Sequence, residues 1–208
     1  MTIKSNKLIK IMKKLLLTLS AVAVLGLAAN AQTEKGKFIV GGQVGYHGSS
    51  VKDTDNKNNS LIINPNVGYF VADNIAIGTG IGYEWSKFEQ ANYPERTESA
   101  FVLTPFGRMY SKNDGPVKFF GQLSVPMAWG TQKIDDTKTA TTANYGVELA
   151  PGIAYFPTSN IGVEFKVRGL FYNNSSVTEE STDTKVTTDT YGLNVNSLAP
   201  TVGVTFHF

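Results

Sequence analysis

Cysteine, charged residues and long apolar runs are all scarce in this sequence. It has no cysteine, which excludes disulfides, thiolate metal sites and cysteine nucleophiles. Charged residues make up 17% of it, against roughly 25% in typical soluble domains. After residue 32 no apolar run approaches the roughly 20 residues that a membrane-spanning helix needs. A chain so poor in charge suits contact with lipid, and this one would have to cross a membrane as strands.

The net charge of +2 is unevenly distributed along the chain. Residues 1–31 hold five lysines and no acidic residue, so the remaining chain has 14 basic and 17 acidic residues and a net charge of −3. The basic balance therefore belongs to the N-terminal segment, and bulk charge gives no reason to expect nucleic-acid binding.

The N-terminal segment has the organisation of an export signal. Lys13 and Lys14 precede an uncharged run over residues 15–28. Fourteen residues are too few for a comfortable transmembrane helix. Met12 is an alternative translation start, because Lys13 and Lys14 directly after it already supply the basic residues of a signal peptide. An uncleaved N-terminal membrane anchor is the alternative to a signal peptide.

Small residues follow the apolar run at the spacing that signal peptidase reads. Ala29 and Ala31 occupy those positions, so Gln32 is the expected first residue of the mature chain. The sequence therefore predicts a cleaved signal peptide over 1–31 and one domain over 32–208. Without a cysteine to carry lipid, the mature protein is not expected to be a lipoprotein.

Beyond residue 32 the dominant periodicity is two, which is the period of a β-strand. In residues 75–85 one face is apolar, whereas the other holds mostly glycine and alanine. The alternation recurs in eight segments, each long enough to cross a bilayer as a tilted strand: 37–48, 61–70, 75–86, 100–110, 117–130, 144–156, 161–173 and 191–208.

Charge placement supports a barrel over a soluble sandwich. Seven charged side chains lie within the cores of the predicted strands, all on the face opposite the apolar stripe, which chance would produce about one time in a hundred. Small residues otherwise dominate that face, as suits a narrow lumen. We therefore predict an all-β fold, an eight-stranded antiparallel up-and-down transmembrane β-barrel, with these charges in the lumen: Glu84, Arg108, Lys118, Glu148, Glu164, Lys166 and Arg168.

The predicted connections alternate between short and long. Three are short, and four are long, polar and expected to be solvated loops. This alternation places both termini of an even-stranded barrel in the periplasm and the long loops outside. The short connections cover residues 71–74, 111–116 and 157–160, and the long ones cover 49–60, 87–99, 131–143 and 174–190.

Prolines recur once per predicted hairpin and conflict with a closed ladder, because proline has no backbone N–H to donate. Pro65, Pro105, Pro151 and Pro200 each fall in an even-numbered strand, and Pro126 falls in the fifth. We expect a local β-bulge at each of the five.

The sequence ends on an alternating apolar segment that finishes at Phe208. Together with Gly68-Tyr69-Phe70, Asp73-Asn74-Ile75 and Pro105-Phe106-Gly107-Arg108, this ending resembles the outer-membrane β-barrel domain family, the small OmpA- and OmpX-like barrels often called porin family proteins. The resemblance covers about residues 35–208. It implies residence in the outer membrane of a Gram-negative bacterium.

In that family the aromatic C-terminus is the address that the barrel-assembly machinery reads. The resemblance carries this role to Val202, Val204, Phe206 and Phe208. The alternative is that these residues simply form a last buried strand.

No residue set points clearly to catalysis or to a metal. His47 near Ser49, Ser50 and Asp53 could imitate the His–Ser–acid set of a lipid-modifying barrel enzyme, but no glycine elbow surrounds a serine. Asp53 with Asp55, and Asp135 with Asp136, lack the ligand spacing of a calcium loop. We predict no catalytic residue, no metal and no cofactor.

Aromatic residues cluster towards the strand ends. An interfacial belt in the lipid headgroups explains this placement, and stacking on carbohydrate by Trp85 or Trp129 is the alternative. The belt residues are Tyr46, Tyr69, Tyr83, Trp85, Trp129, Tyr145 and Tyr155.

An eight-stranded barrel has an interior just wide enough for its own side chains. The sequence therefore favours a monomeric, non-enzymatic scaffold that contacts outer-membrane lipids and offers its loops to an extracellular ligand. A narrow pore and a lipid-modifying enzyme are the alternatives. Strand register predicts that Glu148 and Arg168 pair across strands six and seven.

Overall fold

The computed structural model describes residues 33–52, 54, 56–194 and 201–208. The predicted signal peptide with its cleavage residues Ala29, Ala31 and Gln32 lies outside the described residues, as do Asp53, Asp55 and Pro200. Within the described ranges, no helix is long and apolar enough to cross a membrane.

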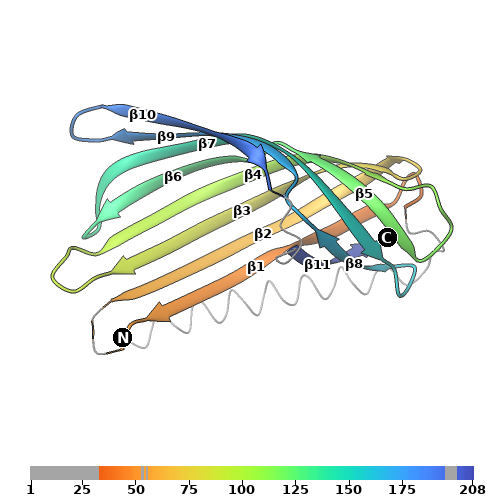
Figure 1. The fold of residues 1–208 in the computed structure, drawn as a ribbon, viewed down its shortest axis with the longest axis horizontal. Helices are drawn as coiled ribbons and strands as arrows, with labels where there is room; N and C mark the ends of the chain where they lie inside the picture. Colours follow the sequence, from red (N-terminus) through yellow and green to blue (C-terminus); the bar gives the residue numbers. More distant parts are fainter. Residues whose placement is uncertain (1–32, 53, 55, 195–200) are drawn as a thin grey trace.

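The described chain forms one antiparallel sheet (Figure 1). Its strands are β1 (Phe38–Ser50), β2 (Lys57–Ala72), β3 (Ile75–Glu89), β4 (Arg96–Tyr110), β5 (Val117–Ser124), β6 (Met127–Ile134), β7 (Thr137–Tyr155), β8 (Ile161–Lys166), β9 (Leu170–Glu179), β10 (Lys185–Leu193) and β11 (Thr201–His207).

These eleven segments make eight barrel strands, as predicted. β5 and β6 are two halves of one strand, because both pair with β4 on one side and β7 on the other. β8 and β9 likewise both pair with β7, and β11 and β10 pair with them in turn. The barrel closes where β1 meets β11, and Phe38 and Phe208 exchange two backbone hydrogen bonds of 2.9 Å.

The β1–β11 pairing that the described residues show lies at one end of the barrel. Beyond Val40, β1 is paired with β2 alone, and β10 is paired with β9 alone, among the residues that the structure describes. Tyr46 on β1 and Tyr191 on β10 are correspondingly 72% and 79% exposed. In the other half of the wall, the described residues show no backbone pairing between β1 and β10.

The two ends of the barrel differ. The short-turn end, at the right of Figure 1, holds Phe208 and the connections over residues 73–74, 111–116 and 156–160. The opposite, hairpin end holds the β1–β2, β3–β4, β6–β7 and β9–β10 hairpins.

The expectation of four long solvated loops is wrong. β7 begins at Thr137, so the connection expected over 131–143 shrinks to the two residues Asp135 and Asp136. Both have positive φ, 47° and 66°, as a type I′ hairpin turn requires. The physical reason is that polar, threonine-rich residues continue the ladder beyond the apolar zone, since each added pair satisfies backbone groups and threonine favours strands.

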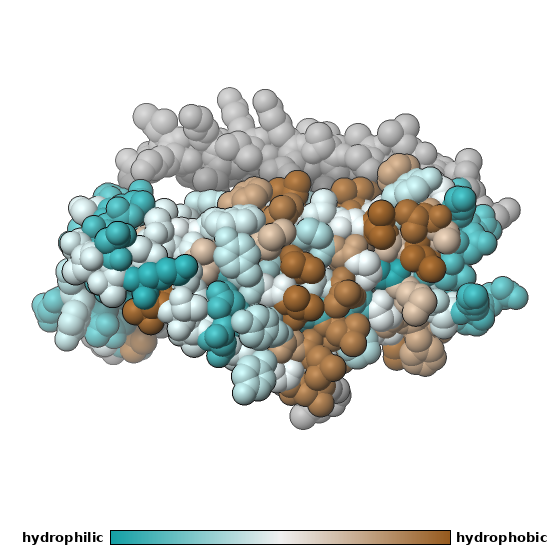
Figure 2. All heavy atoms as spheres, turned by 90° about the horizontal axis from the view of Figure 1, so that it is seen from above, coloured by the Kyte–Doolittle hydropathy of each residue, from teal (hydrophilic) through white to brown (hydrophobic). Residues whose placement is uncertain are grey.

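Outward-facing apolar residues form a belt around the barrel. Ile77, Phe119 and Leu149 are 54%, 62% and 46% exposed, whereas the residues beside them in the sequence face inward. Figure 2 shows the apolar residues of one face gathered in a band, with polar residues at both ends. Tyr83, Trp129 and Tyr145, three of the predicted belt residues, also project outward.

The prolines interrupt the ladder with less disturbance than expected. The predicted bulges at Pro65, Pro105 and Pro126 are wrong, because the register is the same before and after each of them. At Pro126 the chain leaves the ladder for two residues, and the hydrogen bonds Val125 N to Pro105 O and Gly146 N to Pro126 O still bridge the gap. A missing N–H removes a bond without requiring an extra residue.

A bulge does lie opposite Pro151. Gly152 pairs with Lys166, but Leu149 pairs with Leu170, so residues 167–169 face only two residues of β7. One extra residue reverses the facing of every residue that follows it. Inward residues are therefore even-numbered in β8 and odd-numbered in β9.

Candidate functional site

The short-turn end of the lumen is filled by rings, here called the aromatic plug: Phe70, Tyr110, Phe120, Phe156 and His207, with Ile39 beside them. Phe70, Phe156 and His207 are at most 2% exposed. The ring centroids of Tyr110 and Phe120 lie 5.6 Å apart, and Phe156 meets His207 edge-on at 5.0 Å. These separations are those of favourable aromatic pairs.

Glycines on the inward face make room for the rings. A Cβ on Gly152 would lie 2.3 Å from Cζ of Phe120, and one on Gly78 would lie 2.6 Å from Cζ of Phe106. Neither approach is possible for a side chain. The small residues that the sequence places on the lumen face therefore accommodate large residues from neighbouring strands.

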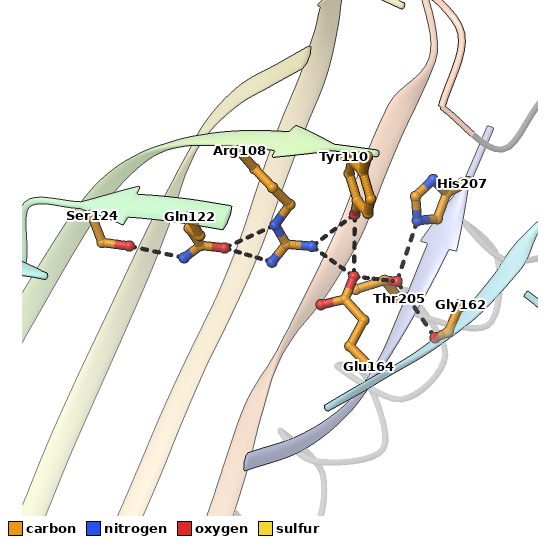
Figure 3. A network of polar contacts seen from close by, with 8 residues as sticks. All are labelled: Arg108, Tyr110, Gln122, Ser124, Gly162, Glu164, Thr205 and His207. Atoms are coloured by element: carbon orange, nitrogen blue, oxygen red, sulfur yellow. Dashed lines mark hydrogen bonds and ion pairs between the residues drawn. The ribbon is translucent and has the colours of Figure 1, made fainter. Parts of the chain in front are cut away.

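A buried ion pair crosses the lumen directly above the plug (Figure 3). Arg108 on β4 and Glu164 on β8 are 8% and 9% exposed, and Nη1 of the arginine lies 2.6 Å from Oε1 of the glutamate. The same Nη1 donates to the hydroxyl of Tyr110 at 2.9 Å, and that hydroxyl donates to Glu164 at 3.3 Å. The guanidinium also lies 4.5 Å from the ring centre of Phe120. Ion pair and plug thus form one packed unit.

Polar side chains on both sides extend this unit into a network. Gln122 accepts from Nε and Nη2 of Arg108 at 2.9 and 2.6 Å, and its amide donates to Ser124 at 2.8 Å. On the other side Thr205 contacts Glu164 at 3.1 Å and Nε2 of His207 at 3.3 Å. The network reaches from β5 to β11, so it ties opposite walls together.

The chain also covers the plug from outside the barrel. Thr33 donates to Oδ1 of Asn74 at 2.7 Å, and Lys118 donates to the carbonyl of Asn113 at 2.6 Å. Thr33 and Lys118 are 6% and 7% exposed. The short-turn end is thus closed by a second layer beneath the rings.

Glu148 and Arg168 form the predicted ion pair, but the predicted register is wrong, because Glu148 pairs with Phe171 and Arg168 lies in the bulge between β8 and β9. Nε of Arg168 lies 3.0 Å from Oε2 of Glu148, and its guanidinium lies 4.0 Å from the ring centre of Phe171. The arginine side chain is 46% exposed and the glutamate 21% exposed, so this pair is far wetter than Arg108 with Glu164.

The remaining predicted lumen charges lie at two levels. Lys166 lines a cavity of about 170 Å³ next to the Arg108–Glu164 pair. Glu84 lines a second cavity of about 360 Å³ towards the hairpin end, together with Glu98, Gln132 and Asn144. The lumen therefore changes from a packed base to an open, polar upper part.

An outward ion-pair cluster lies on β3 beyond the last belt residue, Trp85. Lys87 contacts Glu95 at 2.7 Å and Glu89 at 2.9 Å, and Lys57 reaches Glu89 at 3.8 Å. The hydrogen bond from Lys87 lowers the pKa of Glu89, while Glu95 and then Glu89 raise the pKa of Lys87. The cluster links the β1–β2 and β3–β4 hairpins at the surface.

The described residues around His47 form no enzyme-like constellation, and Asp53 lies outside them. It faces Ser60 across the β1–β2 pair, while Ser49 pairs with Asn58, and the described residues give His47 no hydrogen bond to a serine. Asp135 is a turn residue whose carboxylate accepts from the amide of Glu95 at 2.9 Å. Within the described part of the chain, no three His, Cys, Asp or Glu side chains gather to hold a metal.

Sequence reasoning missed the aromatic plug. Tyr110, Phe120 and Phe156 are even-numbered, like the inward charges of their strands, and Phe70 lies on the same face as Asn64, Asn66 and Gly68, so alternation alone could have placed them inside. It also missed the partnership of Arg108 with Glu164, although it assigned both residues to the lumen.

The chain was compared with solved structures, curated proteins and protein families. Neisserial surface protein A is 13% identical, with a TM-score of 0.47, over 84% of this chain and 98% of its own. The outer membrane protein OprG from Pseudomonas aeruginosa is 14% identical, with a TM-score of 0.50, over 86% of this chain and 99% of its own; that likeness is one of fold alone. No curated protein matches the chain. Residues 17–206 match the family described as outer membrane protein beta-barrel domain, and this protein belongs to that family.

Proposed function

We propose that this protein is a monomeric, non-conducting and non-enzymatic scaffold of the outer membrane that presents its four hairpins at the cell surface. Its short-turn end, with both ends of the mature chain, faces the periplasm. Outer-membrane lipids surround its apolar belt, and the barrel-assembly machinery engages its last strand.

The observation that carries the proposal is the packed base of the lumen. Solute passing along the barrel would have to displace the aromatic plug and the buried pair of Arg108 and Glu164. Separating such a pair is costly, because each charge would then be buried alone. The hairpin end supports the proposed display at the cell surface, because its strands are polar on both faces and would be unfavourable inside a bilayer.

Conductance in a planar bilayer tests the closed lumen. We expect the refolded wild-type protein to give no steady channels, and the double variant Phe70→Ala with Phe156→Ala to give them, because it removes two rings of the plug. The matched control is Phe119→Ala with Leu123→Ala, which removes two lipid-facing side chains from β5. Steady wild-type channels would refute the proposal.

Cysteine labelling tests the orientation of the barrel in the membrane. Because the sequence has no cysteine, only the introduced residue can react. A single cysteine at Asp136, in the β6–β7 turn, should react with a membrane-impermeant maleimide on intact cells. One at Lys112, in a short connection, should react only after the outer membrane is opened. The reverse pattern would place the hairpins in the periplasm.

A narrow conduit is the second candidate. The polar cavity beside Glu84 favours it, since it gives the upper lumen room for a small solute. The same conductance measurement separates the two functions.

A further inference from the structure

Within the described residues, Lys166 is the one inward cation above the plug that forms no ion pair. Arg108 is paired with Glu164, and Arg168 is paired with Glu148. Lys166 is only partly exposed, yet the described residues offer its ammonium no ion pair and no hydrogen bond. A cation held away from bulk water without an ion pair is unfavourable, and an anionic ligand beside it would stabilise its charged form.

The surrounding cavity has the size and the donors for one. Its volume of about 170 Å³ exceeds the share of several water molecules, each about 30 Å³. Arg108 has five N–H groups and uses four in the bonds described above, which leaves one on Nη2. Asn66 and Thr104 line the same cavity with an amide and a hydroxyl.

The charge balance favours a negative ligand. The charged residues that line the cavity are Arg108, Lys166 and Glu164, a net charge of +1. Glu164 is already committed, because Arg108, Tyr110 and Thr205 all converge on its Oε1. The ammonium of Lys166 is therefore the charged group in the cavity that is available to bind an anion from solution.

We propose that this cavity binds a small inorganic anion of the size of phosphate, with Lys166 as its principal ligand. Arg108 supplies a second donor through its spare N–H, and access is from the upper lumen. The site neutralises the positive base of the lumen. It does not depend on whether the barrel conducts.

Isothermal titration of the refolded mature protein in uncharged detergent, with sodium phosphate as the probe, tests the site. We expect saturable binding to the wild type. Lys166→Met should weaken it at least about tenfold, because charge-assisted hydrogen bonds are the strong ones in a site of this kind. Lys166→Arg should retain most of the affinity. The matched control is Lys118→Met, another inward lysine, whose ammonium is already bonded to the carbonyl of Asn113, and its affinity should stay within about twofold of the wild type.

Folding of each variant is checked by far-ultraviolet circular dichroism before titration. If Lys166→Met does not fold, Lys166→Gln takes its place, since it keeps a polar stem without the charge. A wild type that shows no saturable binding overturns the proposal. So does a folded, uncharged variant that binds phosphate as tightly as the wild type, or an equal loss in Lys118→Met.

Discussion

Arg108 and Glu164 stand 56 residues apart in the chain, on strands that are not neighbours, yet they meet at 2.6 Å inside the barrel. Their contact spans the bore and links β4 to β8 across it. It therefore holds together walls that backbone pairing alone does not join.

The first prediction concerns this pair. Glu164→Gln should lower the free energy of unfolding by about 3–5 kcal/mol, because it leaves the arginine charged and buried without a counter-charge. Adding Arg108→Met should recover much of the loss, since no buried charge then remains. Urea unfolding in detergent is the measurement. If the loss in the double variant equals the sum of the losses in the single variants Glu164→Gln and Arg108→Met, the two side chains do not interact.

The pair of Glu148 and Arg168 should behave differently. Because the arginine is 46% exposed, its coupling to Glu148 should be below about 1 kcal/mol. A double-mutant cycle of Glu148→Ala and Arg168→Ala measures it. A coupling as large as that of a buried pair would mean that water does not reach this level of the lumen.

Gly152 should tolerate no side chain. Gly152→Ala would press on Phe120 and also lie 2.7 Å from the backbone carbonyl of Phe165, so we expect a loss of about 1–3 kcal/mol. Gly121→Ala is the matched control, because its added Cβ would meet nothing within 4 Å. The measurement is thermal unfolding of both variants. Equal midpoints would contradict the close packing of Gly152 against Phe120.

How far the sequence predicts this structure depends on what each residue touches. The eight strands follow from alternation, because one face meets lipid and the other does not. The short turn placed Glu148 and Arg168 close enough for their long side chains to meet, but it did not reveal the bulge that sets Phe171, not Arg168, opposite Glu148. Arg108 with Glu164 was not, because pairing rules relate only adjacent strands.

The hairpins show the opposite difficulty. Residues 137–143 are polar and rich in threonine, a composition typical both of solvated loops and of strands with water on both faces. Alternation of polarity carries no information once neither face meets lipid. The length of these strands could therefore not be predicted from the sequence. The inward position of Phe70 and Tyr110 could have been predicted from alternation.

The last residue should matter for assembly. Phe208 exchanges two backbone hydrogen bonds with Phe38 at the point of closure. We expect deletion of Phe208, or Phe206→Ala with Phe208→Ala, to leave unfolded protein in the periplasm. Fractionation of cells producing each variant is the check, and full recovery in the outer membrane would show that the terminal aromatic residues are dispensable.

The β6–β7 turn offers a gain in stability. Asp136 has a φ of 66°, which glycine adopts at less cost than other residues. Asp136→Gly should therefore stabilise the barrel by about 0.5–1 kcal/mol, and Asp136→Val should destabilise it by more. Asp135 stays unchanged, because its carboxylate accepts from Glu95. Urea midpoints that rank the variants otherwise would exclude the type I′ turn.

The length of β7 has a consequence for what an antibody or a phage meets on the cell. The strand has 19 residues, and about 10 cross a bilayer. The remainder, at about 3.3 Å per residue and tilted, rises roughly 20 Å above the lipid. With the hairpin end outside, as proposed, paired strands of the barrel wall extend above the membrane surface. Its epitopes are then shapes shared between neighbouring strands, which short linear peptides cut from the same hairpins would not reproduce.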